Sequence, residues 1–85
     1  MSVVRTIECY DKKTEGLAHE IVISPEITVE QLRKGLTHYD LTDDPDLCLG
    51  YPINKDNAEI LMKITQLDIP YTQYDCFLAV YEKTG

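Results

Sequence analysis

The chain has 85 residues and a mass of 9.7 kDa, which is enough for one small domain over residues 1–85 and too little for a second. Fifteen Asp and Glu residues against eight Lys and Arg give a net charge of −7, which argues against direct binding to nucleic acid or an anionic membrane. The longest apolar run, residues 76–81, is far shorter than the roughly twenty residues of a membrane-spanning helix, and no signal peptide is recognised, so we expect a cytoplasmic protein.

The N-terminal part of the chain has the pattern of a β-hairpin. Residues 3–10 and 19–24 are predicted strands, and the polar segment 11–16 between them ends in glycine and is predicted to form a turn. Alternate residues of the first strand point to opposite faces: Val3, Ile7 and Cys9 to one, and Val4, Thr6, Glu8 and Tyr10 to the other.

A first helix is predicted directly after the hairpin. Thr28, followed three residues later by Gln31, has the spacing of a capping box, which places the helix at residues 29–38. Gly35 weakens the last turn by roughly 1 kcal/mol relative to Ala, so an early end is compatible with the pattern.

The rest of the chain is predicted to contain a long connection, a second helix and a final strand. Residues 39–53 include two prolines and a glycine and are expected to be irregular, with a brief extended piece at 47–51. The second helix is expected to begin at Asn54 or Asp56, because apolar residues then recur at helical spacing. Residues 74–82 are predicted to form a central strand, because their interior is apolar on both faces.

The expected order is therefore strand, strand, helix, helix, strand, which predicts an α+β domain. Its small, mainly antiparallel sheet should carry both helices on one face, and the last strand should pair beside the first. A domain of this size has room for a contact surface, but not for a deep enzyme cleft with its own lid.

Most of the negative charge lies in the second half of the chain. Residues 39–85 hold nine acidic and three basic residues, and the densest segment, residues 40–46, has four carboxylates and no counter-charge. A patch of one sign steers association with an oppositely charged protein, and aromatic residues beside it are typical of binding hot spots. The predicted partner-binding residues are Tyr39, Asp40, Asp43, Asp44, Asp46 and Tyr51.

Other interpretations of the acidic residues remain open. A calcium loop also uses carboxylates at alternate positions, but an EF-hand would need Gly and Glu where Pro45 and Tyr51 stand. A solvated loop without a partner is the second alternative for residues 40–46. Three further carboxylates around the hairpin either extend the acidic surface or keep an edge strand soluble: Asp11, Glu15 and Glu20.

The sequence contains no pattern typical of an enzyme. His19 begins a strand and His38 ends a helix, where it is expected to complement the helix dipole, and the four glycines are isolated from one another. The widely spaced Cys9, Cys48 and Cys76 argue against a disulfide framework or a zinc site and predict buried free thiols. We therefore predict a non-enzymatic protein without a cofactor or metal; an enzyme would need an exposed cysteine with a lowered pKa.

Two stretches resemble immunity proteins of the cloacin and colicin ribonuclease type. Residues 9–15, Cys-Tyr-Asp-Lys-Lys-Thr-Glu, resemble the aromatic-Asp-Lys-x-Thr-Glu hairpin of those proteins, and residues 74–81 are similar to their strand Asp-Tyr-Phe-Val-Ser-Phe. The chain also resembles a widespread bacterial family of small domains with the same hairpin, Tyr-Pro-Ile at 51–53 and Tyr-Asp-x-Phe-Leu at 74–78. Members of that family occur at toxin-immunity loci, including those of contact-dependent growth inhibition.

The resemblance implies a cytoplasmic antidote that binds a bacterial toxin domain, with a basic nuclease such as an RNase as the leading case. The resemblance implies the role of an immunity protein but not which residues contact the toxin. Cloacin-type immunity proteins are nearly all strand, whereas this chain has two helical patterns. A second resemblance, of residues 27–33 and 41–45 to ubiquitin-like Ras-association domains, implies instead an adaptor that pairs an exposed strand edge at 20–24 with a signalling protein.

Overall fold

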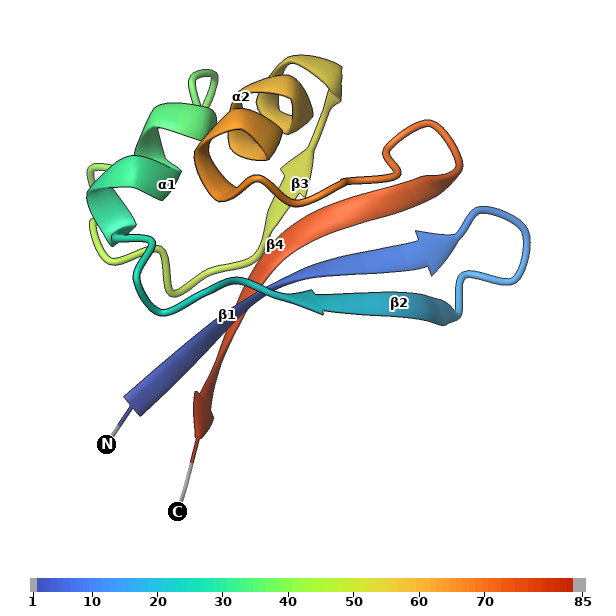
Figure 1. The fold of residues 1–85 in the computed structure, drawn as a ribbon, viewed down its shortest axis with the longest axis horizontal. Helices are drawn as coiled ribbons and strands as arrows, with labels where there is room; N and C mark the ends of the chain where they lie inside the picture. Colours follow the sequence, from blue (N-terminus) through green and yellow to red (C-terminus); the bar gives the residue numbers. More distant parts are fainter. Residues whose placement is uncertain (1, 84–85) are drawn as a thin grey trace.

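Residues 2–83 are described by a computed structural model, in which the first and last strands form the centre of one antiparallel sheet. Strand β1 (Ser2–Asp11) pairs with β4 (Tyr74–Lys83) along its whole length, from Ser2 opposite Lys83 to Asp11 opposite Tyr74. Strand β2 (Leu17–Val22) lies outside β1, and β3 (Tyr51–Ile53) lies outside β4, so the sheet order is β2-β1-β4-β3 (Figure 1).

The predicted hairpin is confirmed, with its second strand displaced by two residues toward the turn. The carboxylate of Asp11 organises this turn, because its Oδ1 accepts hydrogen bonds from the backbone N–H groups of Lys13 at 2.7 Å and Thr14 at 3.0 Å. Glu15 then adopts the left-handed conformation, with a φ of 62°, which returns the chain toward β2. Near the turn, the β1–β2 register shifts between Cys9 and Tyr10.

Both predicted helix starts are confirmed. Helix α1 (Val29–Gly35) begins after a complete capping box between Thr28 and Gln31, and α2 (Lys55–Thr65) begins after Asn54, the first of its two predicted caps. Helix α2 ends where Gln66 takes a left-handed conformation, with a φ of 59°.

Helix α1 ends at Gly35, three residues earlier than predicted, where it lies against α2. A Cβ on Gly35 would overlap with Cδ2 of Leu61, so glycine allows this close approach of the two helices. Beyond it, Leu36 has a non-helical ψ of 53°. His38 therefore does not cap a helix, contrary to the expectation, and its Nε2 lies 3.7 Å from Oδ2 of Asp56.

The two helices pack side by side on one face of the sheet, as predicted for the α+β domain (Figure 1). A buried polar contact joins them, because the Asn57 side-chain amide donates a hydrogen bond to the Gly35 carbonyl at 2.7 Å. The core between helices and sheet is formed mainly by fully buried aliphatic side chains: Ile7, Leu32, Leu36, Leu47, Leu61, Ile69 and Leu78.

The opposite face of the sheet has no helix against it. Strand β4 is central, as predicted, but its apolar residues are covered by helices on one side only. The extended piece predicted at 47–51 is instead found at Tyr51–Ile53, where it adds the short edge strand β3. Among residues 2–83, no helix has both the length and the apolar character needed to cross a membrane.

Candidate functional site

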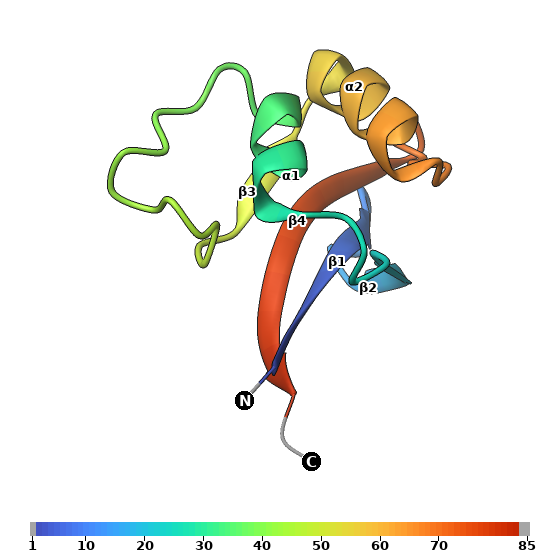
Figure 2. The ribbon, with the colours of Figure 1, turned by 60° about the vertical axis from the view of Figure 1, so that its left-hand side comes forward.

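The segment predicted to bind a partner lies in the long connection between α1 and β3. Figure 2 shows this connection arching outward from the helices and the sheet. We call residues 40–46, with their four aspartates, the acidic loop. The side chains of Leu41 and Leu47 are buried at its two ends, so the connection is anchored in the core.

Asp44 faces the protein interior and is only 8% exposed. Its carboxylate accepts hydrogen bonds from the backbone N–H groups of Cys48 at 2.8 Å and Leu49 at 2.9 Å, and a short one from the Tyr51 hydroxyl. The bond from Tyr51 is the main cause that lowers the pKa of Asp44, and the same bond raises the pKa of Tyr51 to about 12.

Asp44 and Tyr51 therefore do not belong to an exposed patch, contrary to what the charge pattern suggested. Tyr51 is only 7% exposed, and together the two side chains fasten the connection to β3. A carboxylate that already accepts three hydrogen bonds inside its own chain has little capacity left for a partner.

Of the other predicted contact residues, three remain exposed carboxylates: Asp40, Asp43 and Asp46. Asp40 accepts hydrogen bonds from the hydroxyl of Thr42 at 2.6 Å and from its backbone N–H at 3.0 Å, which lower the pKa of Asp40. Tyr39 is half-buried, and its hydroxyl donates to the carbonyl of Pro52 at 2.6 Å.

The acidic loop has no metal-binding geometry. Within the described part of the chain, residues 2–83, there is no group of three or more His, Cys, Asp or Glu side chains that could hold a metal ion. The calcium interpretation thus receives no support, because a calcium site needs six or more oxygen ligands gathered around one point.

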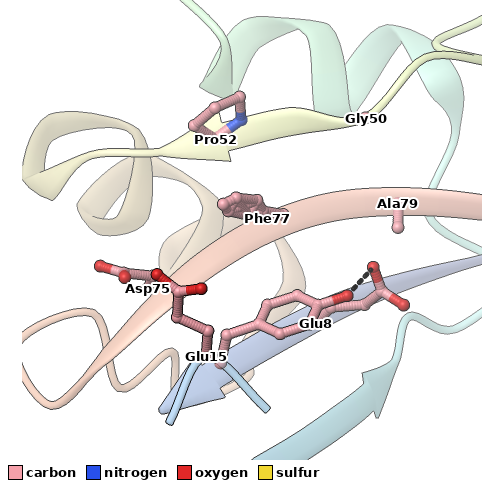
Figure 3. Close-up of a pocket in the computed structure, with 8 residues that line it drawn as sticks. Glu8, Glu15, Gly50, Pro52, Asp75, Phe77 and Ala79 are labelled. Atoms are coloured by element: carbon pink, nitrogen blue, oxygen red, sulfur yellow. Dashed lines mark hydrogen bonds between the residues drawn. The ribbon is translucent and has the colours of Figure 1, made fainter. Parts of the chain in front are cut away.

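A second acidic region lies on the sheet face that no helix covers. A pocket of about 530 Å³ opens there, between the hairpin turn, the two central strands and β3 (Figure 3). We call it the sheet pocket, and it is lined by Glu8, Tyr10, Glu15, Gly50, Pro52, Asp75, Phe77 and Ala79.

The antiparallel register brings these residues together from distant parts of the sequence. Glu8 pairs with Phe77 and Tyr10 with Asp75 across β1 and β4, while Pro52 of β3 pairs with Phe77 from the other side. Directly paired residues of an antiparallel sheet point to the same face, so all five side chains lie on the uncovered one.

Aromatic rings form the centre of the sheet pocket. The rings of Tyr10 and Phe77 meet edge to face, with centroids 5.6 Å apart and planes at 77°. The Tyr10 hydroxyl donates a hydrogen bond to Oε1 of Glu8 at 3.2 Å, the bond that Figure 3 draws as a dashed line. Burial, followed by the neighbouring Glu8 carboxylate, raises the pKa of Tyr10.

Three carboxylates surround the aromatic rings, with Glu8 on one side and Glu15 and Asp75 on the other (Figure 3). None of them has a basic partner within 4 Å among the described side chains, 3–81, where the one close basic–acidic contact is that of His38 with Asp56. The sheet pocket therefore combines apolar surface with three carboxylates that form no ion pair.

Reasoning from the sequence missed most of this site. Alternation along β1 did separate Glu8 and Tyr10 from the core face, and Glu15 was recognised as a surface carboxylate near the hairpin. The sequence predicts a central strand at 74–82 that is apolar on both faces, but it does not reveal that one face of β4, where Phe77 lies half-buried, has no helix over it.

The cysteines separate into two kinds. Cys9 and Cys76 are buried opposite each other with their Sγ atoms 3.6 Å apart, and burial raises the pKa of both thiols, that of Cys76 to about 12. Cys48 is exposed, which corrects the prediction that all three would be buried. A raised pKa disfavours the reactive thiolate at Cys9 and Cys76.

Comparison with known proteins relates the chain to a family and to nothing more specific. Residues 4–79 match the family described as "Domain of unknown function (DUF7683)". No curated protein and no solved structure gives a significant match.

Proposed function

The chain belongs to the DUF7683 family, and we propose that it is a cytoplasmic immunity protein that binds and neutralises a basic bacterial toxin domain, with a nuclease such as an RNase as the leading case. The observation that carries this proposal is the sheet pocket, a half-buried aromatic surface ringed by Glu8, Glu15 and Asp75, with no basic residue in its lining. Such a surface is complementary to a protein that itself carries positive charge.

The physical reason for pairing this surface with a nuclease is the charge that a nuclease needs. A domain that cleaves RNA or DNA presents basic side chains to the phosphate backbone, and an acidic protein covers that surface by the same attraction. An antidote must also bind quickly. Electrostatic steering raises association rates to on the order of 10⁸ M⁻¹s⁻¹ at low salt, which suits a chain with a net charge of −7.

The two segments that resemble ribonuclease immunity proteins lie side by side in the sheet. The hairpin segment 9–15 and the closing strand 74–81 lie at opposite ends of the sequence, yet β1 and β4 pair directly, with Tyr10 opposite Asp75. Both segments contribute to the sheet pocket. The parts of the chain with the resemblance thus supply Tyr10, Glu15, Asp75 and Phe77 to the pocket lining.

The acidic loop keeps a role in this proposal, although a smaller one. Asp40, Asp43 and Asp46 add to the long-range attraction of a basic partner, while the aromatic contact surface lies in the sheet pocket. We therefore expect substitutions of the acidic-loop carboxylates to change mainly the association rate with the toxin. Substitutions in the sheet pocket should change mainly the dissociation rate.

The test is co-expression of the chain with the protein encoded beside it. We expect the pair to co-purify and the growth defect caused by that protein to be rescued. Two double variants then locate the surface: Glu8→Gln with Asp75→Asn in the sheet pocket, and Asp43→Asn with Asp46→Asn in the acidic loop, which remove equal charge. The proposal is wrong if no complex forms and no growth defect is rescued.

A strand-edge adaptor is the alternative function, and the free edge of β2 is the observation that favours it. The N–H of Ile23 bonds to the carbonyl of Arg5, so by antiparallel alternation the N–H of Val22 points to the free edge. An adaptor that adds a partner strand there should lose binding in Val22→Pro and depend only weakly on salt. An immunity protein that uses the sheet pocket should still bind its partner in Val22→Pro, and its binding should depend strongly on salt.

A further inference from the structure

We propose that the sheet pocket receives an arginine side chain of the partner protein. This deepens the proposed function, because it rests on the partner being a basic protein, and it adds the chemical group that enters the pocket. The inference follows from the size, lining and charge of the pocket.

The sheet pocket is large enough to admit a long side chain. Its volume of about 530 Å³ lies within the roughly 300–1,000 Å³ typical of ligand pockets. It is open toward solvent on the uncovered sheet face, so a residue that protrudes from another protein can reach it without any movement of the helices (Figure 3).

The lining has an apolar centre and a charged rim. Phe77 and Ala79 of β4 are half-buried and Pro52 of β3 is exposed, so together they offer apolar surface to the methylene groups of a long side chain. The rings of Tyr10 and Phe77 stand nearly perpendicular to each other, and an aromatic ring face attracts a cation.

The carboxylates indicate a guanidinium in preference to other cations. Glu8 lies on one side of the pocket and Asp75 and Glu15 on the other, so the donors of the ligand must point in more than one direction (Figure 3). A planar guanidinium presents five N–H donors and stacks on aromatic rings, whereas an ammonium is a compact and strongly hydrated point charge. A metal ion does not fit, because these carboxylates do not gather around one point.

Other classes of ligand fit less well. An anion such as phosphate would meet three carboxylates and no basic side chain within the pocket lining. A purely apolar side chain would cover Phe77 but would leave the carboxylates without partners and partly desolvated, which costs free energy.

The experiment is an NMR titration of the isotope-labelled chain at low salt with N-acetylarginine amide, and in parallel with N-acetylcitrulline amide, its uncharged isostere. We expect arginine amide to give saturable shifts of backbone resonances in β1, β3 and β4, with a dissociation constant on the order of 1–10 mM. The citrulline compound should bind at least about tenfold more weakly, because it lacks the charge that the carboxylates attract.

Matched variants test the site itself. In Glu8→Gln with Asp75→Asn, each lost carboxylate should weaken arginine amide binding by about two- to fivefold. Phe77→Leu, which keeps an apolar side chain and removes the ring, should also weaken it. Asp43→Asn with Asp46→Asn, an equal charge change in the acidic loop, should leave it unchanged. The same spectra show whether each variant is folded.

The possible outcomes separate this inference from the proposed function. Equal binding of the citrulline compound, shifts confined to the acidic loop, or pocket variants that bind like the wild type would each overturn the arginine site. If a toxin complex forms while the arginine site fails, the immunity function stands with a different contact. If arginine amide binds as expected while no toxin complex or rescue is found, the pocket stands and the immunity function falls.

Discussion

Asp44 illustrates how a single residue can be acidic, lie in an acidic segment and still have a structural role. Its carboxylate holds the backbone of Cys48 and Leu49 and the hydroxyl of Tyr51, so it closes the connection between α1 and β3. Asp43, its neighbour in sequence, is exposed. The two residues are therefore a matched pair for mutagenesis.

We expect Asp44→Asn to lower the melting temperature at neutral pH by about 5–15 °C, because an amide cannot accept all three hydrogen bonds. The lowered pKa of Asp44 means that its stabilisation is complete above its ordinary pKa of about 4 and is lost as the pH falls through the lower value in the folded state. The difference in melting temperature between wild type and variant should therefore shrink in acid. Asp43→Asn is the control and should melt like the wild type; equal melting of both variants would contradict the assignment.

The Tyr51 hydroxyl should affect stability at alkaline pH. Its pKa is raised to about 12, so the hydrogen bond from its hydroxyl stabilises the fold fully below pH about 10 and is lost as the pH rises toward 12. The gap in unfolding free energy between wild type and Tyr51→Phe should close over that interval. Denaturant titrations at a series of pH values would measure it, and a gap that stays constant above pH about 11 would refute the role given to this hydroxyl.

The contact between the helices depends on one glycine. Gly35 ends α1 where the helix lies against Leu61 of α2, and Asn57 bonds to its carbonyl. The side chains of Leu61 and Asn57 are both fully buried. Ordinary helix propensity would favour Ala at this position, and the tertiary contact overrides it.

Gly35→Ala should therefore destabilise the protein by about 1–3 kcal/mol, through overpacking against Leu61. Gly50→Ala is the matched control, because the added Cβ would meet its nearest neighbour, the Leu78 carbonyl oxygen, at an ordinary 3.9 Å. Urea unfolding of the two variants measures the difference. A Gly35→Ala variant as stable as the wild type would mean that Leu61 moves aside at little cost.

Charge is the property that belongs to the molecule as a whole. The chain has a net charge of −7 with His counted as neutral, and among the described side chains, 3–81, no Lys or Arg forms an ion pair with a carboxylate. Repulsion between carboxylates thus opposes the compact state, and the carboxylates around the sheet pocket contribute to it. If these carboxylates bind a basic partner, their mutual repulsion lowers the stability of the free protein until the partner is bound.

We accordingly expect salt to stabilise the free protein. Raising NaCl from about 10 mM to about 0.5 M shortens the Debye length from roughly 30 Å to only a few Å and should raise the melting temperature by a few degrees. Glu8→Gln with Asp75→Asn should melt higher at low salt and respond less to added salt, while binding its partner more weakly. A melting temperature that falls with salt would indicate that favourable ion pairs dominate instead.

The sequence by itself determined the elements of this protein, because their signals are local. The capping boxes at Thr28 and Asn54 and the alternation in β1 depend on residues a few positions apart, so element types and the α+β class were predictable. The apolar interior of β4 likewise predicted a central strand. The total charge and its concentration after His38 were also readable directly.

Only the tertiary structure decided which side of each element faces solvent and which distant residues meet. Asp44 turns inward and Cys48 outward because of how the long connection packs, and α1 stops where Leu61 leaves no room for a Cβ. The candidate site joins Glu8 and Asp75, far apart in the sequence, through the register of β1 and β4. The sheet pocket is exposed because no helix packs on that face of the sheet. The periodicity of residues within a strand carries no information about which elements cover either face of the strand.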